Sequence, residues 1–235
     1  MSVIKYCISL LLLISVVEAQ VIPENEYGLE VIETIDLYLE TVEQDSSKLL
    51  VDLEEFISSI VLDVKYATTD NFTEQQLYPY PRAFLRYPAA VALRKVQDEL
   101  NGSGLGLKVW DAYRPYTTTV LMWDYVRDPR YVADPRNGSR HNRGCAVDVT
   151  LIDLETGEEL PMPTHYDDFT EQAHLDYDDL SEEVLDNRAL LIDVMRWHGF
   201  EPLPSEWWHF DYKDWSEFEL MDLSFEELEA LTGVE

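Results

Sequence analysis

Apolar residues alternate with polar or small ones in three separate stretches of the chain. The alternation covers residues 62–66, 105–109 and 146–152. A period of two is typical of strands that turn one face toward a core. Residues 205–212 are rich in aromatic side chains and are also predicted as a strand. The pattern therefore predicts at least four strands after residue 60.

Helical signals lie between and after these stretches. Residues 88–100 begin with a proline and are followed by Asn-Gly, which suits the first turn and the end of a helix. Residues 116–126 and 181–198 are also predicted as helices, and a glycine follows the second of them. Ser224 and Glu227 form a capping box, which predicts a short helix near the C-terminus.

The remaining stretches predict how these elements connect. Residues 127–143 are rich in Pro, Arg, Asn and Gly and are predicted as a long loop, a feature that is often functional. Short turns such as Gly102–Gly104 favour antiparallel pairing of neighbouring strands. We therefore predict an α+β fold, a single domain with a central, mainly antiparallel sheet flanked by helices.

The N-terminus has the pattern of a secretory signal peptide. Lys5 precedes an apolar run from Ile8 to Val17, and small residues then surround a plausible cleavage point after Ala19. The run is too short for a convincing membrane span. We predict a signal peptide at 1–19, a secreted or periplasmic protein, and no integral membrane anchor after cleavage.

The segment after the signal peptide is acidic. Apolar residues from Leu29 to Val42 recur at helical spacing, which predicts one amphipathic helix that can pack outside the main core. We divide the mature chain into an acidic extension at 20–50 and the main domain at 51–235.

Composition and charge argue against nucleic acid as a partner. The chain has 235 residues, 46% of them hydrophobic, and a formal net charge of −30. Such a charge repels phosphate backbones, so nucleic acid is not an expected partner.

Cys7 leaves with the signal peptide, and Cys145 then has no cysteine to pair with. A small buried residue is the favoured role for Cys145, with nucleophile or ligand as alternatives.

Three residues form a candidate metal site. His141 and Asp148 are seven residues apart, so on one continuous strand they would face opposite sides. Gly144 lies between them and can adopt the turn that would bring both side chains to one point. His209, in the sequence E-W-W-H, supplies a second imidazole. Two histidines and a carboxylate are a common catalytic zinc set that leaves a fourth position for water.

Glu206 is the natural base beside this site. Zinc lowers the pKa of a bound water to roughly 7, so a nearby carboxylate can take its proton and later pass it to a leaving amine. Each motif alone also fits a bland role, such as an aspartate paired on a strand or an aromatic edge strand. Their occurrence together on one chain favours the metal site.

At these residues the chain resembles the zinc D-alanyl-D-alanine dipeptidases, including those of vancomycin resistance, over about residues 51–212. The resemblance implies a fold like that of Hedgehog and the D-Ala-D-Ala peptidases, with one zinc ion per chain. Four blocks carry it: D-V-K-Y-A-T-T-D-N-F at 63–72, V-W-D-A-Y-R-P at 109–115, S-R-H-N-R-G-C-A-V-D at 139–148, and G-F-E-P-L-P-S-E-W-W-H-F at 199–210.

The resemblance also implies a role for each matching residue. His141, Asp148 and His209 would bind zinc, and Glu206 would be the general acid/base. Arg114 would stabilise the oxyanion that forms when water attacks the scissile carbonyl, which is physically sensible for a fixed guanidinium. A structural ion pair with a nearby acid such as Asp111 is the alternative role for Arg114.

Two further positions would hold the ends of a dipeptide. Ser139 matches a family serine that could contact the substrate carboxylate. Asp167 lies in P-M-P-T-H-Y-D, which is similar to the family's P-M-G-S-x-F-D, where the aspartate would bind the substrate ammonium. Asp168 is the alternative counterpart. Pro163 replaces the usual glycine of this block, so its loop can differ in shape.

These implications predict zinc-dependent hydrolysis of D-alanyl-D-alanine and similar small dipeptides to free D-amino acids, through a metal-activated water. The main alternative is a D,D-carboxypeptidase or another peptidoglycan peptidase with the same metal residues. A non-catalytic, zinc-stabilised binding module is a third possibility, because a fold does not fix a function. A small dipeptide is the expected partner, and no oligomeric state is predicted.

Overall fold

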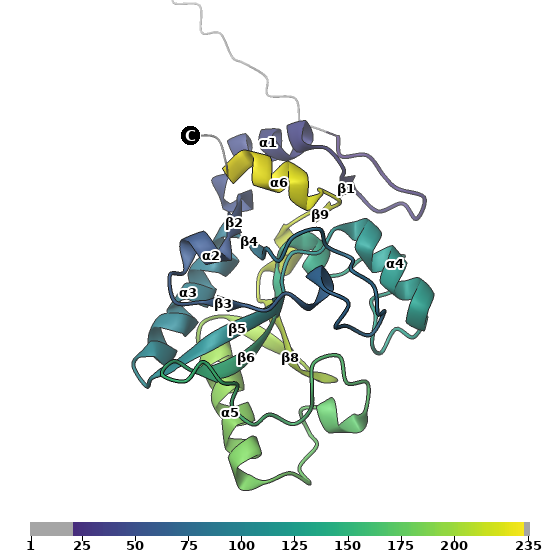
Figure 1. Ribbon diagram of the computed structural model, residues 1–235. Coiled ribbons are helices and arrows are strands. Elements are labelled where there is room, and N and C mark those ends of the chain that lie inside the picture. The colour runs from purple at the N-terminus through teal and green to yellow at the C-terminus, as the bar shows by residue number, and fades with distance from the viewer. Residues whose placement is uncertain (1–20, 233–235) are drawn as a thin grey trace, which may run out of the picture.

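A five-stranded sheet forms the centre of the molecule in this computed structural model, which describes residues 21–232 (Figure 1). One of its four strand pairings is parallel, and the other three are antiparallel. The prediction of an α+β fold with a mainly antiparallel sheet is therefore confirmed. In sheet order the strands are β3 (Val61–Leu62), β5 (Leu105–Asp111), β6 (Ala146–Asp153), β8 (Glu206–Tyr212) and β7 (Phe200–Leu203).

Two long helices pack side by side against this sheet. Helix α3 (Tyr87–Asn101) buries Leu93, Val96 and Leu100, whose spacing of three and four residues places them on one face. It contacts β5, whereas α5 (Glu182–Trp197) contacts β6 and β7. Helix α5 begins as predicted after Ser181, whose side-chain oxygen accepts a hydrogen bond from the Val184 N–H. Within residues 21–232 no helix is long and apolar enough to cross a membrane.

Shorter elements surround this core. Two small sheets pair strands that are distant in sequence, β1 with β9 in parallel and β2 with β4 in antiparallel fashion. The predicted capping box is present, because Ser224 and Glu227 exchange hydrogen bonds at the start of the last helix. The remaining bounds are β1 (Val31–Ile32), β2 (Leu50–Asp52), β4 (Phe84–Arg86), β9 (Leu220–Met221), α1 (Ile35–Gln44), α2 (Leu53–Phe56), α4 (Tyr116–Val126) and α6 (Phe225–Thr232).

The acidic extension packs differently from the prediction. Its helix begins only at Ile35, because Val31 and Ile32 form β1 and the side chain of Thr34 caps α1. Ile32 and Tyr38 are fully buried in the main core, and the Tyr38 hydroxyl accepts a hydrogen bond from the Leu50 N–H at 2.6 Å. The extension is thus part of the core rather than outside it. The predicted signal peptide at 1–19 lies outside the described residues.

Two other sequence predictions are refined by the structure. The strand predicted over 62–66 is short, since β3 ends at Leu62 and a 3-10 turn occupies Lys65–Ala67. This turn directs the fully buried Tyr66 toward the interior.

Cys145 is fully buried, and burial raises the pKa of its thiol to about 12. The thiol stays protonated at neutral pH, which suits the predicted role of a small buried residue.

Candidate metal centre

Three acidic and basic residues lie in one row across the central sheet. Asp148 on β6 stands directly opposite His209 on β8, and on its other side it stands opposite Asp111 on β5. Side chains of directly opposed residues share one face and approach closely. The register of β5 shifts between Val109 and Asp111, a β-bulge of the kind that often re-aims side chains beside active sites.

His141 reaches this row from a tight turn. The 3-10 turn His141–Arg143 ends at Gly144, whose φ of +67° lies in the left-handed region. This conformation favours glycine, and a Cβ at this position would lie 2.7 Å from the Cδ2 of Leu50, so the Leu50 side chain would have to shift. As predicted, the break in chain direction at Gly144 lets His141 and Asp148 face one point.

The three predicted ligand residues converge. The Nε2 of His141 lies 3.1 Å from the Nδ1 of His209 and 3.5 Å from the Oδ1 of Asp148. The same Asp148 oxygen is 3.0 Å from the Nδ1 of His209. Asp148 Oδ1 is buried and accepts no hydrogen bond. A buried carboxylate oxygen facing two ring nitrogens is the arrangement that a divalent cation satisfies, so these residues fit zinc.

Hydrogen bonds on the far side of each ring orient the two imidazoles. The Nδ1 of His141 is 2.6 Å from the carbonyl oxygen of Ala112, so Nδ1 is assigned the proton and Nε2 keeps its lone pair. The Nε2 of His209 lies 3.0 Å from the Oδ1 of Asp211, which leaves Nδ1 to face the other ligands. Both lone pairs therefore point toward Asp148.

The local charges favour a cation. Burial alone would lower the pKa of His209, but the carboxylates of Asp211 and Asp148 outweigh it and raise that pKa well above its usual value. Burial would raise the pKa of Asp148, yet the two histidines lower it below its usual range. An electrostatic field that draws a proton to His209 also favours a metal ion at the same place.

Glu206 lies beside this cluster, at the start of β8. Its Oε2 is 4.0 Å from the Nδ1 of His209. The pairing of β7 with β8 shifts register here, so that Pro202 faces Phe210 while Leu203 faces Glu206. This irregularity allows residues three apart to approach the same point, although a regular strand would separate them. Burial raises the pKa of Glu206 to about 7, against the opposing effect of His209.

Arg114 follows β5 and is held from two directions. Its Nε and one terminal nitrogen donate to the Oδ2 of Asp111 at 3.0 and 2.6 Å. Its guanidinium also lies 5.2 Å from the ring centre of Tyr66. Burial would lower the pKa of Arg114, but Asp111 raises it well above its usual value, so the side chain stays charged. Arg114 therefore forms the ion pair with Asp111 that was the alternative prediction, and its side chain also lines a cavity next to the candidate ligands.

A cavity of about 370 Å³ brings together all seven residues predicted for the site. Ser139 is buried in its wall, and its hydroxyl oxygen accepts the N–H of His141 at 3.2 Å. Asp167 adopts a left-handed φ of +58° and accepts a hydrogen bond from the Tyr66 hydroxyl at 3.0 Å. The seven residues are Arg114, Ser139, His141, Asp148, Asp167, Glu206 and His209.

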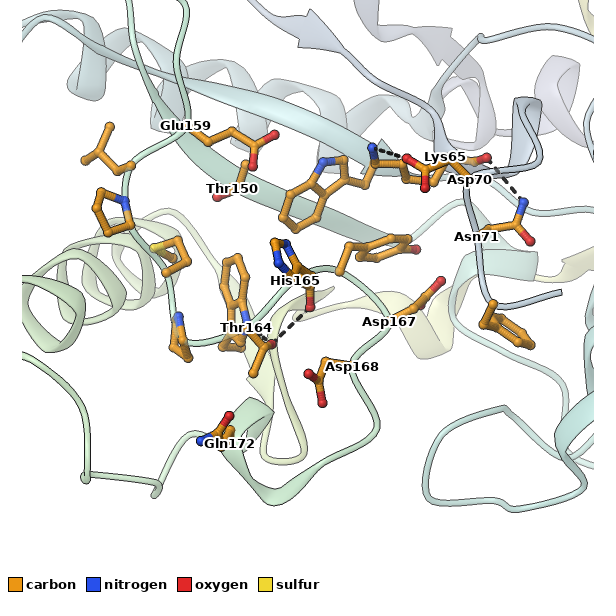
Figure 2. Close-up of a pocket in the computed structure, with 18 of the residues that line it drawn as sticks. Lys65, Asp70, Asn71, Thr150, Glu159, Thr164, His165, Asp167, Asp168 and Gln172 are labelled. Carbon is orange, nitrogen blue, oxygen red and sulfur yellow. Dashed lines mark hydrogen bonds and ion pairs between the residues drawn. The ribbon is translucent and has the colours of Figure 1, made fainter. Parts of the chain in front are cut away.

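Asp167 and its alternative Asp168 differ in which of two cavities they line. A second cavity has a volume of about 1290 Å³. Figure 2 shows Asp167 and Asp168 among the residues that line it. Of the two, only Asp167 also lines the cavity of the metal ligands. Burial raises the pKa of Asp167 well above its usual value, with Asp148 adding to the rise. Pro163 lies in the wall of the second cavity, not in the wall of the first.

Several contacts of the site were not predicted from the sequence. Asp211 is two residues after His209, so the strand period of two was a usable signal for it. Tyr166 donates its hydroxyl to the Oδ2 of Asp148 at 2.8 Å. Asn142 joins the His141 turn to the Arg114 segment, because its amide donates to the Arg114 carbonyl at 2.9 Å. No local pattern marks Tyr166 or Asn142 for these roles.

Known proteins are similar to most of the chain. A family model described as D-ala-D-ala dipeptidase matches residues 46–227. A D-alanyl-D-alanine dipeptidase of Escherichia coli (strain K12) is 37% identical over 172 residues, covering 73% of this chain and 89% of that protein. One from Enterococcus faecium is 32% identical over 185 residues, covering 69% and 90%. A solved vancomycin-resistance D,D-pentapeptidase, VanY in complex with Zn(II), is 16% identical with a TM-score of 0.38, covering 57% and 75%.

Proposed function

This chain belongs to the D-Ala-D-Ala dipeptidase family of metallopeptidases, and from that premise we propose that it hydrolyses D-alanyl-D-alanine and similar small dipeptides to free D-amino acids. One observation carries the proposal. Three candidate zinc ligands, a carboxylate with a pKa of about 7 and a fixed guanidinium line one cavity of about 370 Å³. We propose one Zn²⁺ per chain, held by His141, Asp148 and His209.

Zinc in this position would act as a Lewis acid on the scissile carbonyl and lower the pKa of the attacking water. Glu206 takes one proton from that water while the water oxygen bonds to the carbonyl carbon. Glu206 then gives the proton to the departing amine as the carbon–nitrogen bond breaks. A pKa of about 7 suits both transfers, because the group can accept and release a proton near neutral pH.

Arg114 stabilises the negative charge that develops on the carbonyl oxygen. Its two hydrogen bonds to Asp111 hold the guanidinium in place before substrate arrives. A donor fixed in advance loses little energy to reorganisation when charge appears, which is the main advantage of such sites. The partnership with Asp111 therefore serves the catalytic role rather than competing with it.

Asp167 and Ser139 are suited to the two ends of a free dipeptide. The substrate ammonium would pair with the Asp167 carboxylate, and that charge would lower the raised pKa of Asp167. The Ser139 hydroxyl can donate to the substrate carboxylate. A buried carboxylate in the wall favours a free ammonium over a blocked amine, which supports a dipeptidase over a carboxypeptidase.

Release of D-alanine tests this proposal. The zinc-loaded protein should release D-alanine from D-Ala-D-Ala, and the chelated protein should not. Activity should fall sharply when the substrate amine is acetylated, and it should be weak on L-Ala-L-Ala. A protein that spares D-Ala-D-Ala but cuts longer wall peptides would be a carboxypeptidase instead.

Export of the mature protein is a separate proposal. It rests on the signal-peptide pattern of residues 1–19 alone. Fusion of these residues to a reporter enzyme should direct it out of the cytoplasm, with the new N-terminus at Gln20. Retention of the uncleaved fusion in the cytoplasm would contradict it.

A further inference from the structure

Tyr166 makes a contact that joins the substrate-binding loop to the metal centre. Its hydroxyl donates to the Oδ2 of Asp148 at 2.8 Å, and the next residue along the loop is Asp167. We propose that Tyr166 is a positioning residue for the metal, one whose hydroxyl fixes the Asp148 carboxylate so that a single oxygen faces the cation. This inference rests on the proposed zinc site and extends it to a residue outside the ligand set.

The two oxygens of Asp148 have different surroundings. Oδ2 accepts the Tyr166 hydroxyl, whereas Oδ1 has no hydrogen-bond partner and lies 3.0 Å from His209 and 3.5 Å from His141. A carboxylate held in this way offers one oxygen to a metal and keeps the other engaged. One-oxygen coordination leaves room on the ion for water and a carbonyl oxygen, which the proposed hydrolysis requires.

Aromatic neighbours hold the Tyr166 ring in the orientation that this contact needs. The ring centre lies 5.0 Å from that of Trp110, 5.6 Å from that of Trp208 and 6.0 Å from that of Tyr66. These are tilted or edge-on contacts of the favourable kind. The donor is therefore fixed in place.

Removal of this single hydroxyl tests the inference. Tyr166→Phe keeps the ring and its aromatic contacts, so the fold should persist, but Oδ2 loses its donor. Loss of a group that orients a ligand typically weakens metal binding by about 10- to 100-fold. Competition with a chromogenic chelator should show a rise of that size in the zinc Kd. The visible spectrum of the Co²⁺-substituted protein should change too, because the carboxylate is free to rotate.

Tyr38→Phe is the matched control. It also removes a buried hydroxyl that makes a hydrogen bond, but its partner is the Leu50 N–H in the packed N-terminal segment. This variant should lose stability while its zinc Kd and cobalt spectrum match those of the wild type. A purely structural role for Tyr166 would make the two variants behave alike.

A second background isolates the path through Asp148. In an Asp148→Asn protein, addition of Tyr166→Phe should weaken zinc binding little further, because the carboxylate that Tyr166 orients is already gone. A full additional loss there would overturn the inference, as would an unchanged zinc Kd for Tyr166→Phe alone. Zinc binding without release of D-alanine would contradict only the proposed substrate. Failure of the wild type to bind zinc would overturn both.

Discussion

Glu206 can serve as a base near neutral pH because its surroundings disfavour its charge. Replacement by glutamine removes the proton acceptor but keeps the size of the side chain. Glu206→Gln should lower kcat by about 10²- to 10⁴-fold, the usual contribution of general acid–base catalysis. Zinc binding should be retained, since Glu206 is not a proposed ligand. Steady-state kinetics with D-Ala-D-Ala and a zinc titration measure both quantities.

Glu201→Gln is the matched control for this change. Glu201 lies on β7 at the surface, where it makes only a long ion pair with Arg196 at 3.8 Å. Such exposed pairs contribute little, so its kinetics should equal those of the wild type. A Glu206→Gln protein with wild-type kcat would exclude Glu206 as the base.

The raised pKa of Glu206 predicts how activity depends on pH. In the proposed mechanism the ionised form is the base, and burial raises its pKa to about 7 in the metal-free protein. Activity should therefore fall as pH drops through the pKa, and a bound cation should move that midpoint below 7. Carboxyl NMR of the metal-free protein should show a group that titrates near pH 7 and that Glu206→Gln lacks. A Glu206 signal that titrates near pH 4 would contradict this.

Substitution of Arg114 tests whether catalysis needs a positive charge held in a fixed position or only a positive charge. Lysine keeps the positive charge but cannot make two hydrogen bonds to Asp111 with a planar fork. Arg114→Lys should lower kcat by about 10²- to 10³-fold, as loss of an oxyanion donor does, and leave the zinc Kd unchanged. Arg196→Lys, at a half-exposed surface site, should change neither value. An equal loss in zinc binding would instead indicate a collapsed site.

At the level of elements, the turn at Gly144 brings the proposed metal ligands together. Gly144→Ala would place a Cβ 2.7 Å from Leu50 and force a left-handed conformation on alanine. The conformation alone costs roughly 1–2 kcal/mol, and the Leu50 side chain has to shift to make room for the new methyl group. Chemical unfolding should show at least that loss, together with weaker zinc binding. Gly157→Ala is the control, because its φ of +74° is similar but its Cβ would meet nothing. It should lose stability without losing zinc affinity.

Local signals explain which elements could be predicted from the sequence. The helix predicted at 116–126 matches α4, and the end signals of α5 and the capping box of α6 are used as expected. The strands β1 and β9 are two residues long and exist only because distant segments pair. No short stretch of sequence encodes such a pairing. The predicted helix in the acidic extension therefore extended too far toward its N-terminus.

In the site, too, local sequence blocks could be predicted and contacts between distant segments could not. The seven predicted residues belong to recognisable blocks, and they meet in one cavity. The Tyr166 and Asn142 contacts depend on how one loop lies against another part of the chain. Sequence spacing carries no information about such an approach.

At the scale of the whole molecule, the segments near both ends of the described chain close one side of the fold. Figure 1 shows α1 and α6 together there, and β1 pairs with β9 beside them. Phe225 of α6 packs against the rings of Tyr78, Phe84 and Tyr113. Tyr78 in turn donates its hydroxyl to Asp111, the partner of Arg114. The terminal segments thus support the layer that holds the site.

Removal of the proposed zinc ion should lower the stability of the whole fold. A ligand present at 1,000 times its Kd stabilises the state that binds it by about 4 kcal/mol. For a domain of this size, each kcal/mol shifts the melting temperature by roughly 2–4 °C. Excess chelator should therefore lower Tm by roughly 10 °C, and added zinc should restore it. A Tm that chelator does not change would argue against a tightly bound ion.

The two imidazoles of the metal centre differ in what keeps them oriented. His141 relies on the main-chain carbonyl of Ala112, whereas His209 relies on the carboxylate of Asp211. Every residue type supplies a main-chain carbonyl, so position 112 is limited by space and not by chemistry. Position 211 needs a side-chain carboxylate, which only aspartate and glutamate supply. Random mutagenesis under selection for activity should thus yield varied small residues at 112 but preserve a carboxylate at 211, so the orientation of His209 tolerates fewer substitutions than that of His141.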